Sequence, residues 1–140
     1  MSTSLSEQLY QSLVKKDFDS MLMLLDQGAD ANEPPGPLLM TPLAYASIYG
    51  IKKGIQILLE YGANIETKNR KTGDTPLHLA ALNGNYKCIV TLLENGADIN
   101  ARNNYESTPL FLAASRGYNN CIITLLDYGA DIESKDNQGA

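Results

Sequence analysis

The chain repeats one hydrophobic pattern four times. A pair of leucines, at positions 24–25, 58–59, 92–93 and 125–126, is followed three residues later by a glycine. In the third copy, apolar residues recur at helical spacing ahead of that glycine, at Cys88, Ile89, Leu92 and Leu93. This spacing predicts an amphipathic helix over residues 85–95, which the glycine at position 96 then closes.

A second motif lies between these copies. Thr-Pro-Leu begins at Thr41, Thr75 and Thr108, and a glycine follows each threonine at positions 50, 84 and 117. A threonine hydroxyl can accept from the first free backbone N–H groups of a helix, and proline lacks the N–H that would be unpaired at the next position. We therefore expect a short helix from each Thr-Pro to a glycine in the left-handed conformation. Both motifs recur every 33 or 34 residues, a period typical of a solenoid.

Each unit is thus expected to contain a helix, a turn, a second helix and an extended polar turn. Isolated isoleucines at positions 65, 99 and 132 can anchor the polar turns to the core. Small side chains on the first helices would let neighbouring helices approach closely, and these are Ala46, Ala80, Ala81, Ala113 and Ala114. No unit can bury its apolar face alone, so the units must stack.

At these residues the chain resembles the ankyrin-repeat family. Thr75–Ala81 matches the family motif Thr-Pro-Leu-His-Leu-Ala-Ala at every position, and Asn95–Ala101 is similar to the family's finger sequence. The resemblance covers essentially all 140 residues. It implies an all-α ankyrin-repeat solenoid, in which helix pairs form an L-shaped stack with β-hairpin-like finger loops on one side.

The family register divides the chain into units at residues 1–35, 36–69, 70–102 and 103–135, with 136–140 as the start of a fifth. The first unit lacks Thr-Pro and is interpreted as a polar N-terminal cap, with a candidate capping box over Ser4–Glu7. Leu39 and Glu106 stand where the family usually has glycine. The finger with Leu39 departs most from the pattern, and the tip conformation of the finger with Glu106 is left open.

The fourth unit resembles an internal unit, because its second helix carries Ile122, Ile123, Leu125 and Leu126 instead of the polar outer face of a terminal cap. We hypothesise that the chain is the N-terminal part of a longer array. The alternative is a natural four-unit protein whose last face is simply less polar.

Composition narrows the class of protein. The net charge is −5, from 11 Lys and Arg against 16 Asp and Glu, which argues against a nucleic-acid binder that needs clustered cations. No apolar run approaches the roughly 18 residues of a membrane span, so membrane insertion is not expected. The first residues lack the basic segment and apolar stretch of a secretory signal. We expect an intracellular protein, cytoplasmic or nuclear, or one delivered into a host cell.

The residues that could carry chemistry have structural interpretations. His78, the one histidine, occupies the family's usual histidine position, where the ring can bridge neighbouring turns. Cys88 and Cys121 share one repeat position on second helices, whose axes pack too far apart for a disulfide, so we expect buried, reduced thiols. Two cysteines and a distant histidine do not make a zinc site. We therefore predict no enzyme activity and no catalytic, cofactor-binding or metal-binding residue.

Two sequence features allow a functional interpretation beside a structural one. One is a small basic cluster on the fingers, made of Lys68, Arg70, Lys71 and Arg102. It is either a solvated face or a contact for an acidic patch on a partner. Residues 98–101 resemble sites that asparaginyl hydroxylases modify in ankyrin repeats, although the same residues suffice to build the turn.

The resemblance also implies a binding surface on the concave side, made of the finger tips and the exposed faces of the first helices. The residues at these positions are Leu38, Met40, Ile48, Tyr49, Lys71, Asp74, Leu82, Asn83, Asn104, Tyr105, Ser107, Ser115 and Arg116. An apolar patch without a packing role indicates a contact site, and Tyr and Arg are enriched among binding hot spots. We predict apolar anchoring near Tyr49 and polar or acidic groups near Arg116, unless the proline-rich segment 33–40 covers the patch.

The function expected from these features is a non-catalytic protein–protein interaction module with a protein partner of unknown identity. Two alternatives remain: a recruitment domain of a larger enzyme or channel, or a small self-contained inhibitor of a kinase or transcription factor. We expect a monomer, with self-association through the exposed last repeat as a weaker alternative.

Overall fold

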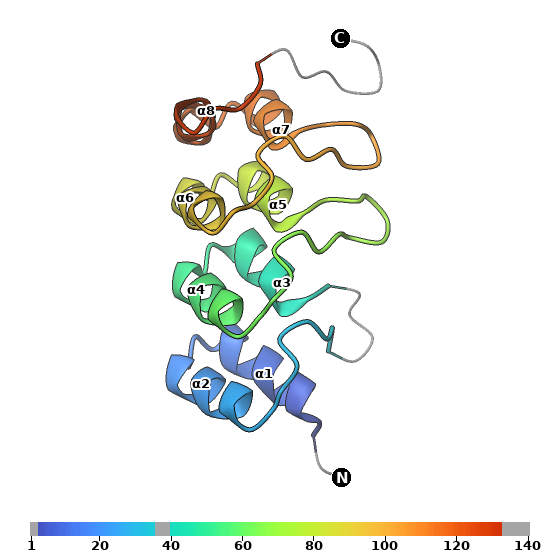
Figure 1. The fold of residues 1–140 in the computed structure, drawn as a ribbon, viewed down its shortest axis with the longest axis vertical. Helices are drawn as coiled ribbons and strands as arrows, with labels where there is room; N and C mark the ends of the chain where they lie inside the picture. Colours follow the sequence, from blue (N-terminus) through green and yellow to red (C-terminus); the bar gives the residue numbers. More distant parts are fainter. Residues whose placement is uncertain (1–2, 36–39, 133–140) are drawn as a thin grey trace.

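The computed structural model describes residues 3–35 and 40–132, and within these ranges the chain forms eight α-helices and no strand. In chain order they are α1 (Leu5–Val14), α2 (Phe18–Asp26), α3 (Pro42–Tyr49), α4 (Lys52–Glu60), α5 (Pro76–Leu82), α6 (Tyr86–Glu94), α7 (Pro109–Arg116) and α8 (Asn119–Asp127). Figure 1 shows four helix pairs stacked along one axis, with α1, α3, α5 and α7 in one row and α2, α4, α6 and α8 in the other. We call these rows the inner and outer helices, and each pair a repeat, numbered from the N-terminus.

The inner helices of repeats 2 to 4 begin as the sequence predicts. The hydroxyls of Thr41, Thr75 and Thr108 accept from backbone N–H groups three residues later, at 3.2, 3.4 and 3.2 Å, and proline follows each threonine. The glycines at 50, 84 and 117 then turn the chain with φ of 72°, 75° and 71°, the left-handed region that side chains disfavour. The predicted helix boundaries are therefore confirmed.

The outer helices begin without a side-chain cap in repeats 2 to 4, and each ends just ahead of a left-handed glycine, at positions 62, 96 and 129. Helix α6 lies inside the predicted range 85–95 and buries Cys88, Ile89 and Leu92 on one face. In repeat 1, Ser4 caps α1 by accepting from the Glu7 backbone N–H at 3.1 Å, which is one half of the expected capping box.

The hydrophobic core runs between the two rows of helices through all four repeats. Four of the five small alanines are fully buried, which confirms the close approach of the inner helices: Ala46, Ala80, Ala81 and Ala113. Ala114 is exposed, because the structure describes no helix pair beyond repeat 4. Ile65 and Ile99 pack against the core as predicted. Ile132 is 72% exposed and does not belong to the residues packed against the core. Both exceptions lie in repeat 4, the last repeat that the structure describes.

One hydrogen bond recurs between the turns that follow the outer helices. The side chains of Asn32, Glu66 and Asn100 hold the same repeat position, and each accepts from a backbone N–H of the next turn. The N···O distances are 2.6 Å to Asn64, 2.8 Å to Asp98 and 3.0 Å to Asp131. These bonds fix the spacing of consecutive repeats at the C-terminal ends of the outer helices.

The fingers are tight loops closed by backbone hydrogen bonds. In one finger the Asn69 N–H donates to Asp74 O at 2.9 Å, and in the next the Asn103 N–H donates to Ser107 O at 3.1 Å. Glu106, which replaces a family glycine, adopts a left-handed φ of 59°, so this finger keeps the glycine-type turn at a conformational cost. The corresponding Leu39 lies outside the described residues.

Candidate protein-interaction surface

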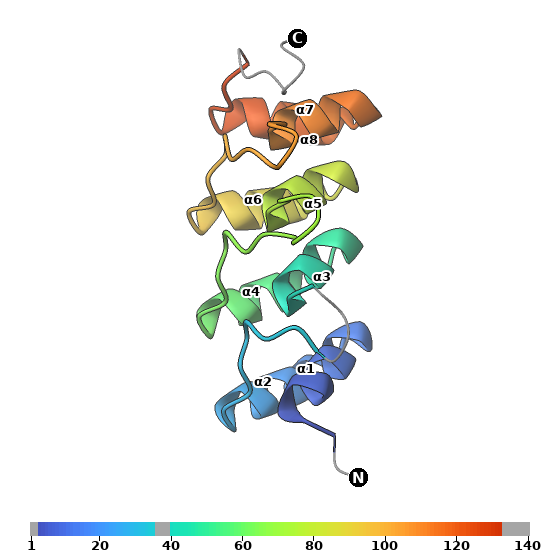
Figure 2. The same ribbon diagram turned by 90° about the vertical axis from the view of Figure 1, so that its right-hand side faces the viewer.

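The candidate surface comprises the fingers and the exposed faces of the inner helices, and we call it the inner surface. In Figure 1 the finger loops project from the inner helices and away from the outer row, and Figure 2 looks onto this side of the stack. Its residues come from all four repeats, because each repeat contributes one inner helix.

An aromatic cluster dominates the inner surface at repeats 1 and 2. Tyr45 and Tyr49 lie one turn apart on α3, with ring centroids 4.5 Å apart. Tyr10 of α1 meets Tyr45 edge to face at 5.1 Å, so Tyr45 is held between two rings. Burial raises the pKa of Tyr45, and its ring is half-buried, whereas Tyr49 is 63% exposed. The cluster therefore presents one fixed, exposed tyrosine ring.

Apolar side chains extend this cluster. The predicted residues Met40, Ile48 and Leu82 are half-buried, and each leaves part of its side chain accessible. Val14 of α1, which holds the repeat position of Ile48, is 42% exposed. Since Tyr49 is largely exposed, the described residues of the proline-rich segment do not cover the patch. Leu38 lies outside the described residues.

A second group of exposed side chains lies at repeats 3 and 4. Tyr105 on the finger of repeat 4 is 55% exposed, and Lys71 and Arg116 are also exposed. Helix α5 separates Arg116 on α7 from Tyr49 on α3 (Figure 1). The predicted residues therefore form two clusters along one surface, and a partner would have to span repeats 2 to 4 to reach both.

Three predicted polar residues are exposed but bonded to their own chain. The Asn83 amide donates to Leu79 O at 2.7 Å, and the Ser115 hydroxyl donates to Leu112 O at 2.8 Å. The Asn104 amide donates to Lys71 O at 3.2 Å and so joins two finger tips. Each of these side chains therefore uses one donor hydrogen within the free protein.

The expectation that Asp74 and Ser107 are displayed at the surface is wrong. They are 7% and 5% exposed. The Asp74 carboxylate accepts from the Thr72 hydroxyl and from the Asn103 amide of the next finger, both at 2.9 Å. The Ser107 N–H donates to the Asn103 side-chain oxygen at 3.0 Å. Both residues are buried because Asn103 bonds to them. Its amide reaches Asp74 in the preceding finger, and its side-chain oxygen accepts from Ser107 in its own finger. The spacing of the motifs does not reveal these contacts.

His78 bridges two repeats, as predicted. The Thr75 N–H donates to its Nδ1 at 3.1 Å, so Nδ1 carries no proton, and Nε2–H donates to Ser107 O at 2.8 Å. The ring is fully buried, and burial lowers the pKa of His78 although the nearby Asp74 and Glu66 carboxylates act to raise it. A neutral imidazole with both nitrogens bonded to the fold has a structural role.

Cys88 and Cys121 are free and buried, as predicted, and burial raises the pKa of the Cys88 thiol to about 11. Such thiols are poor nucleophiles at neutral pH. Across residues 3–35 and 40–132, no group of three or more His, Cys, Asp or Glu side chains is placed to hold a metal ion. No helix in that part of the chain is long and apolar enough to cross a membrane.

The basic cluster lies on the fingers of repeats 3 and 4. Lys68, Arg70 and Lys71 are exposed, and the Arg102 guanidinium donates to Glu106 O at 3.4 Å. Two acidic side chains nearby are bonded within the fold: Asp74 is buried, and Glu66 accepts from the Asp98 N–H. The four cations share the fingers with the exposed Glu106, in a chain whose net charge is −5.

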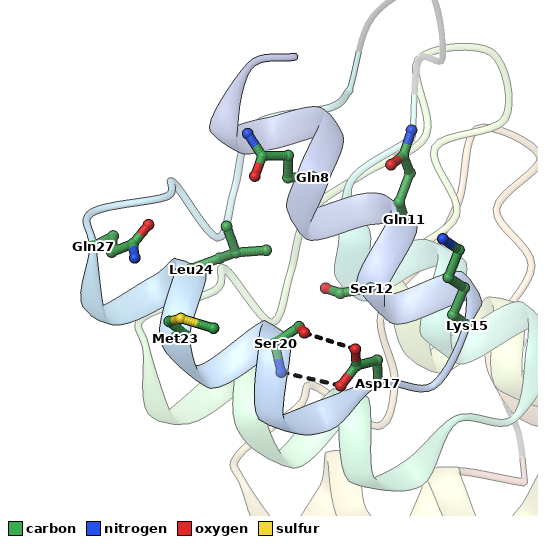
Figure 3. A pocket seen from close by; sticks show the side chains of 9 residues that line it. All are labelled: Gln8, Gln11, Ser12, Lys15, Asp17, Ser20, Met23, Leu24 and Gln27. Atoms are coloured by element: carbon green, nitrogen blue, oxygen red, sulfur yellow. Dashed lines mark hydrogen bonds between the residues drawn. The ribbon is translucent and has the colours of Figure 1, made fainter. Parts of the chain in front are cut away.

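The N-terminal end of the stack has a different character. A hollow of about 330 Å³ lies between α1 and α2 at this end of repeat 1, and Figure 3 shows the side chains that line it. They are mostly polar, among them Gln8, Gln11, Lys15 and Asp17. Asp17 caps α2 by accepting from the Ser20 N–H and hydroxyl, and these bonds lower its pKa. This face is a polar cap, as the first unit of the sequence predicts.

Sequence reasoning missed Tyr45, against which the exposed ring of Tyr49 packs, and Tyr10, which contacts Tyr45. One signal was available, because Tyr45 stands where the next two repeats have Leu79 and Leu112, four residues before Tyr49. A tyrosine at an otherwise leucine position, one helical turn from an exposed tyrosine, indicates an aromatic face.

Comparisons with known proteins agree with this architecture. The family model of ankyrin repeats, in three copies, matches residues 9–103 and 64–136. A putative ankyrin repeat protein, FPV216, of Fowlpox virus (strain NVSL) is 45% identical over 47 residues. That alignment spans 34% of this chain and 16% of the viral relative.

Proposed function

The chain belongs to the ankyrin-repeat family, and we propose that it binds a segment of a protein partner along its inner surface without catalysing a reaction. Ankyrin repeats generally mediate protein–protein interaction and are generally non-enzymatic. The observation that carries the proposal is Tyr49, a large ring that is 63% exposed and packs against Tyr45, which Tyr10 contacts in turn.

A fixed aromatic ring is a good binding anchor for a physical reason. Burying it removes a large apolar area from water, and little side-chain entropy is lost because neighbouring rings already restrict it. The half-buried side chains of Met40, Ile48 and Leu82 surround it with further apolar surface. A partner segment that brings an aliphatic or aromatic side chain to Tyr49 would complete this patch.

Positive charge at repeats 3 and 4 favours an acidic group at the other end of the partner segment. Lys71 and Arg116 are exposed at repeats 3 and 4, while Asp74 is buried and hydrogen-bonded. An acidic group on the partner would meet exposed positive charge there. We propose that the partner is a protein inside a cell, which the viral origin of the matched relative supports.

The test begins with affinity capture from cell lysate, followed by titration of the purified captured protein with this chain. Tyr49→Glu and Arg116→Glu are each expected to raise the Kd at least tenfold, as hot-spot substitutions do. A partner that binds mainly through charge would lose affinity with Arg116→Glu and with added salt, but only weakly with Tyr49→Glu.

The matched control is Tyr86→Glu with Lys87→Glu, which introduces the same charges on the outer helix α6, where both residues are exposed. The control is expected to leave the Kd unchanged. Loss of binding in the control, with retention in the two inner-surface variants, would move the site to the outer helices and overturn the proposal.

A further inference from the structure

The dipeptide Asn-Gly occurs twice in the chain, at residues 83–84 and 95–96, and it carries a chemistry that the interaction surface does not use. The backbone nitrogen of the glycine can attack the Cγ of the asparagine side chain, because glycine has no Cβ to block the approach. The new N–Cγ bond closes a succinimide ring, the Cγ–Nδ2 bond breaks, and the amide nitrogen leaves as ammonia with the proton of the glycine N–H. Water then opens the ring to aspartate or isoaspartate.

The two pairs have the same local structure. Asn83 and Asn95 are both exposed residues at helix C-termini, with φ and ψ of −107° and 7° and of −101° and 14°. The glycines that follow are left-handed, with φ of 75° and 91°. Each asparagine amide donates to the carbonyl four residues earlier, at 2.7 and 2.8 Å, and each glycine N–H donates to the carbonyl three residues earlier, at 3.3 and 3.1 Å. Ring closure breaks both bonds, so it requires local opening of the turn.

The turn at Gly84 is covered by its neighbours. A Cβ added to Gly84 would lie 3.3 Å from the ring of Tyr118, so this ring of repeat 4 lies against the turn. The next residue, Asn85, donates to the Ser47 and Ile48 carbonyls, both at 2.9 Å, which ties the turn to repeat 2. Gly84 is accordingly half-buried. Opening this turn therefore breaks contacts with the repeats on both sides.

The turn at Gly96 has no such cover. Gly96 is exposed, and apart from its chain neighbours no atom lies within 4 Å of the position that an added Cβ would take. A bond to another repeat follows two residues beyond the glycine, where the Asp98 N–H donates to Glu66 at 2.8 Å. Fraying at the end of α6 therefore frees Asn95 and Gly96 without displacing a neighbouring repeat. Helix ends of this kind open at the lowest free energy.

We propose that Asn95 is a site of deamidation in the folded protein, and that the Tyr118 ring protects Asn83, which has the same following residue and the same conformation. The product at position 95 lacks the amide N–H that donates to Thr91 O. It also places a carboxylate beside Glu94 at the C-terminal end of α6, where the helix dipole disfavours negative charge. The isoaspartate form lengthens the backbone of the turn by one carbon. Deamidation therefore loosens the connection between α6 and the finger that follows.

The test incubates the purified chain at pH 8 and follows the amide-to-acid conversion by mass spectrometry. Trypsin cleavage after Lys71, Lys87 and Arg102 puts the two sites in separate peptides. In the folded protein, conversion at Asn95 is expected to be at least tenfold faster than at Asn83. In 8 M urea both sites should convert at similar rates, because each is then an Asn-Gly pair in an open chain. Equal rates in the folded protein, faster conversion at Asn83, or conversion of both sites in urea alone would each overturn the proposal.

Variants at Tyr118 test the cause of the protection. Tyr118→Ala uncovers Gly84 and is expected to raise the rate at Asn83 at least tenfold while leaving the rate at Asn95 unchanged. Tyr118→Phe is the matched control, because it keeps the ring and should keep Asn83 protected. The buried thiol of Cys121 in α8 reports that repeat 4 stays folded, since it should resist labelling in both variants. An unchanged rate at Asn83 in Tyr118→Ala would overturn the role assigned to the ring.

Discussion

Replacing His78 by phenylalanine tests whether the ring ties repeats 3 and 4 together. Phe111 holds the same position in repeat 4, so the fold accepts phenylalanine there in principle. At position 78, however, the substitution leaves the Thr75 N–H without its partner and removes one of two donors to the Ser107 carbonyl, which keeps the Asn103 N–H at 3.1 Å. Thr75 is 1% exposed and Ser107 is 5% exposed, so water cannot readily replace the lost bonds.

The magnitude follows from those two groups. The unsatisfied Thr75 N–H costs about 1–3 kcal/mol and the lost hydrogen bond to Ser107 about 0.5–1.5 kcal/mol, which together predict a loss of about 1.5–4.5 kcal/mol in the free energy of unfolding. The reverse substitution, Phe111→His, is the matched control. Phe111 is half-buried and lines an apolar groove between α7 and α8, and its replacement is expected to change stability by less than about 1 kcal/mol.

The same residue predicts a pH dependence. Burial lowers the pKa of His78 in the folded protein below its ordinary value of about 6.5, so the unfolded chain binds more protons as the pH falls. The stabilisation is complete above about pH 6.5 and declines below it, by at most about 1.4 kcal/mol per pH unit until the lower folded pKa is reached. Because the chain has one histidine, the slope between pH 7 and 5.5 belongs to His78.

Urea unfolding followed by circular dichroism at pH 7.5, 6.5 and 5.5 measures both effects. His78→Phe should lower the midpoint at pH 7.5 and flatten the decline toward pH 5.5. A variant within about 0.5 kcal/mol of the parent at pH 7.5, or one that keeps the full pH slope, would refute the assigned bonds and protonation state.

Three shorter predictions test the loops and the core. Glu106→Gly should raise the free energy of unfolding by about 0.5–1 kcal/mol in urea titrations, because Glu106 sits at φ of 59°; a loss of stability would contradict the left-handed turn. Gly73→Ala should lower it by about 1–3 kcal/mol, because φ is 74° and a Cβ would lie 2.9 Å from Asn104 N; an unchanged midpoint would speak against this finger geometry. Cys88 and Cys121 should resist a thiol-reactive disulfide reagent at pH 8 in the native protein and react fully in 8 M urea, since both are buried and burial raises their pKa; rapid native labelling would disprove that burial.

The elements that sequence reasoning recovered depend on contacts within a few residues. Thr41, Thr75 and Thr108 cap helices through an N–H three positions ahead, and the glycines that follow need only their own backbone freedom. Such interactions are present in the order of the residues. Cys88, whose burial follows from helical spacing, was recovered for the same reason.

The candidate surface was recovered less completely. Asp74 and Ser107 were expected at the surface, yet Asn103 bonds to both, reaching Asp74 across one repeat and Ser107 within its own finger. Tyr49 was predicted as a contact residue, but the rings that hold it were not. In both cases the deciding contact joins residues that the linear pattern treats as independent.

The sequence by itself determined the repeat period, the helix boundaries, the polar N-terminal cap and the structural role of His78. Only the tertiary structure decided which finger residues are buried, which tyrosines stack, and that the two ends of the solenoid differ in polarity at the level of side chains. The physical reason is the distance along the chain over which each kind of interaction acts. Caps, turns and amphipathic spacing arise between neighbours in the chain, whereas burial and complementarity arise between repeats, about 30 residues apart, once those repeats have stacked.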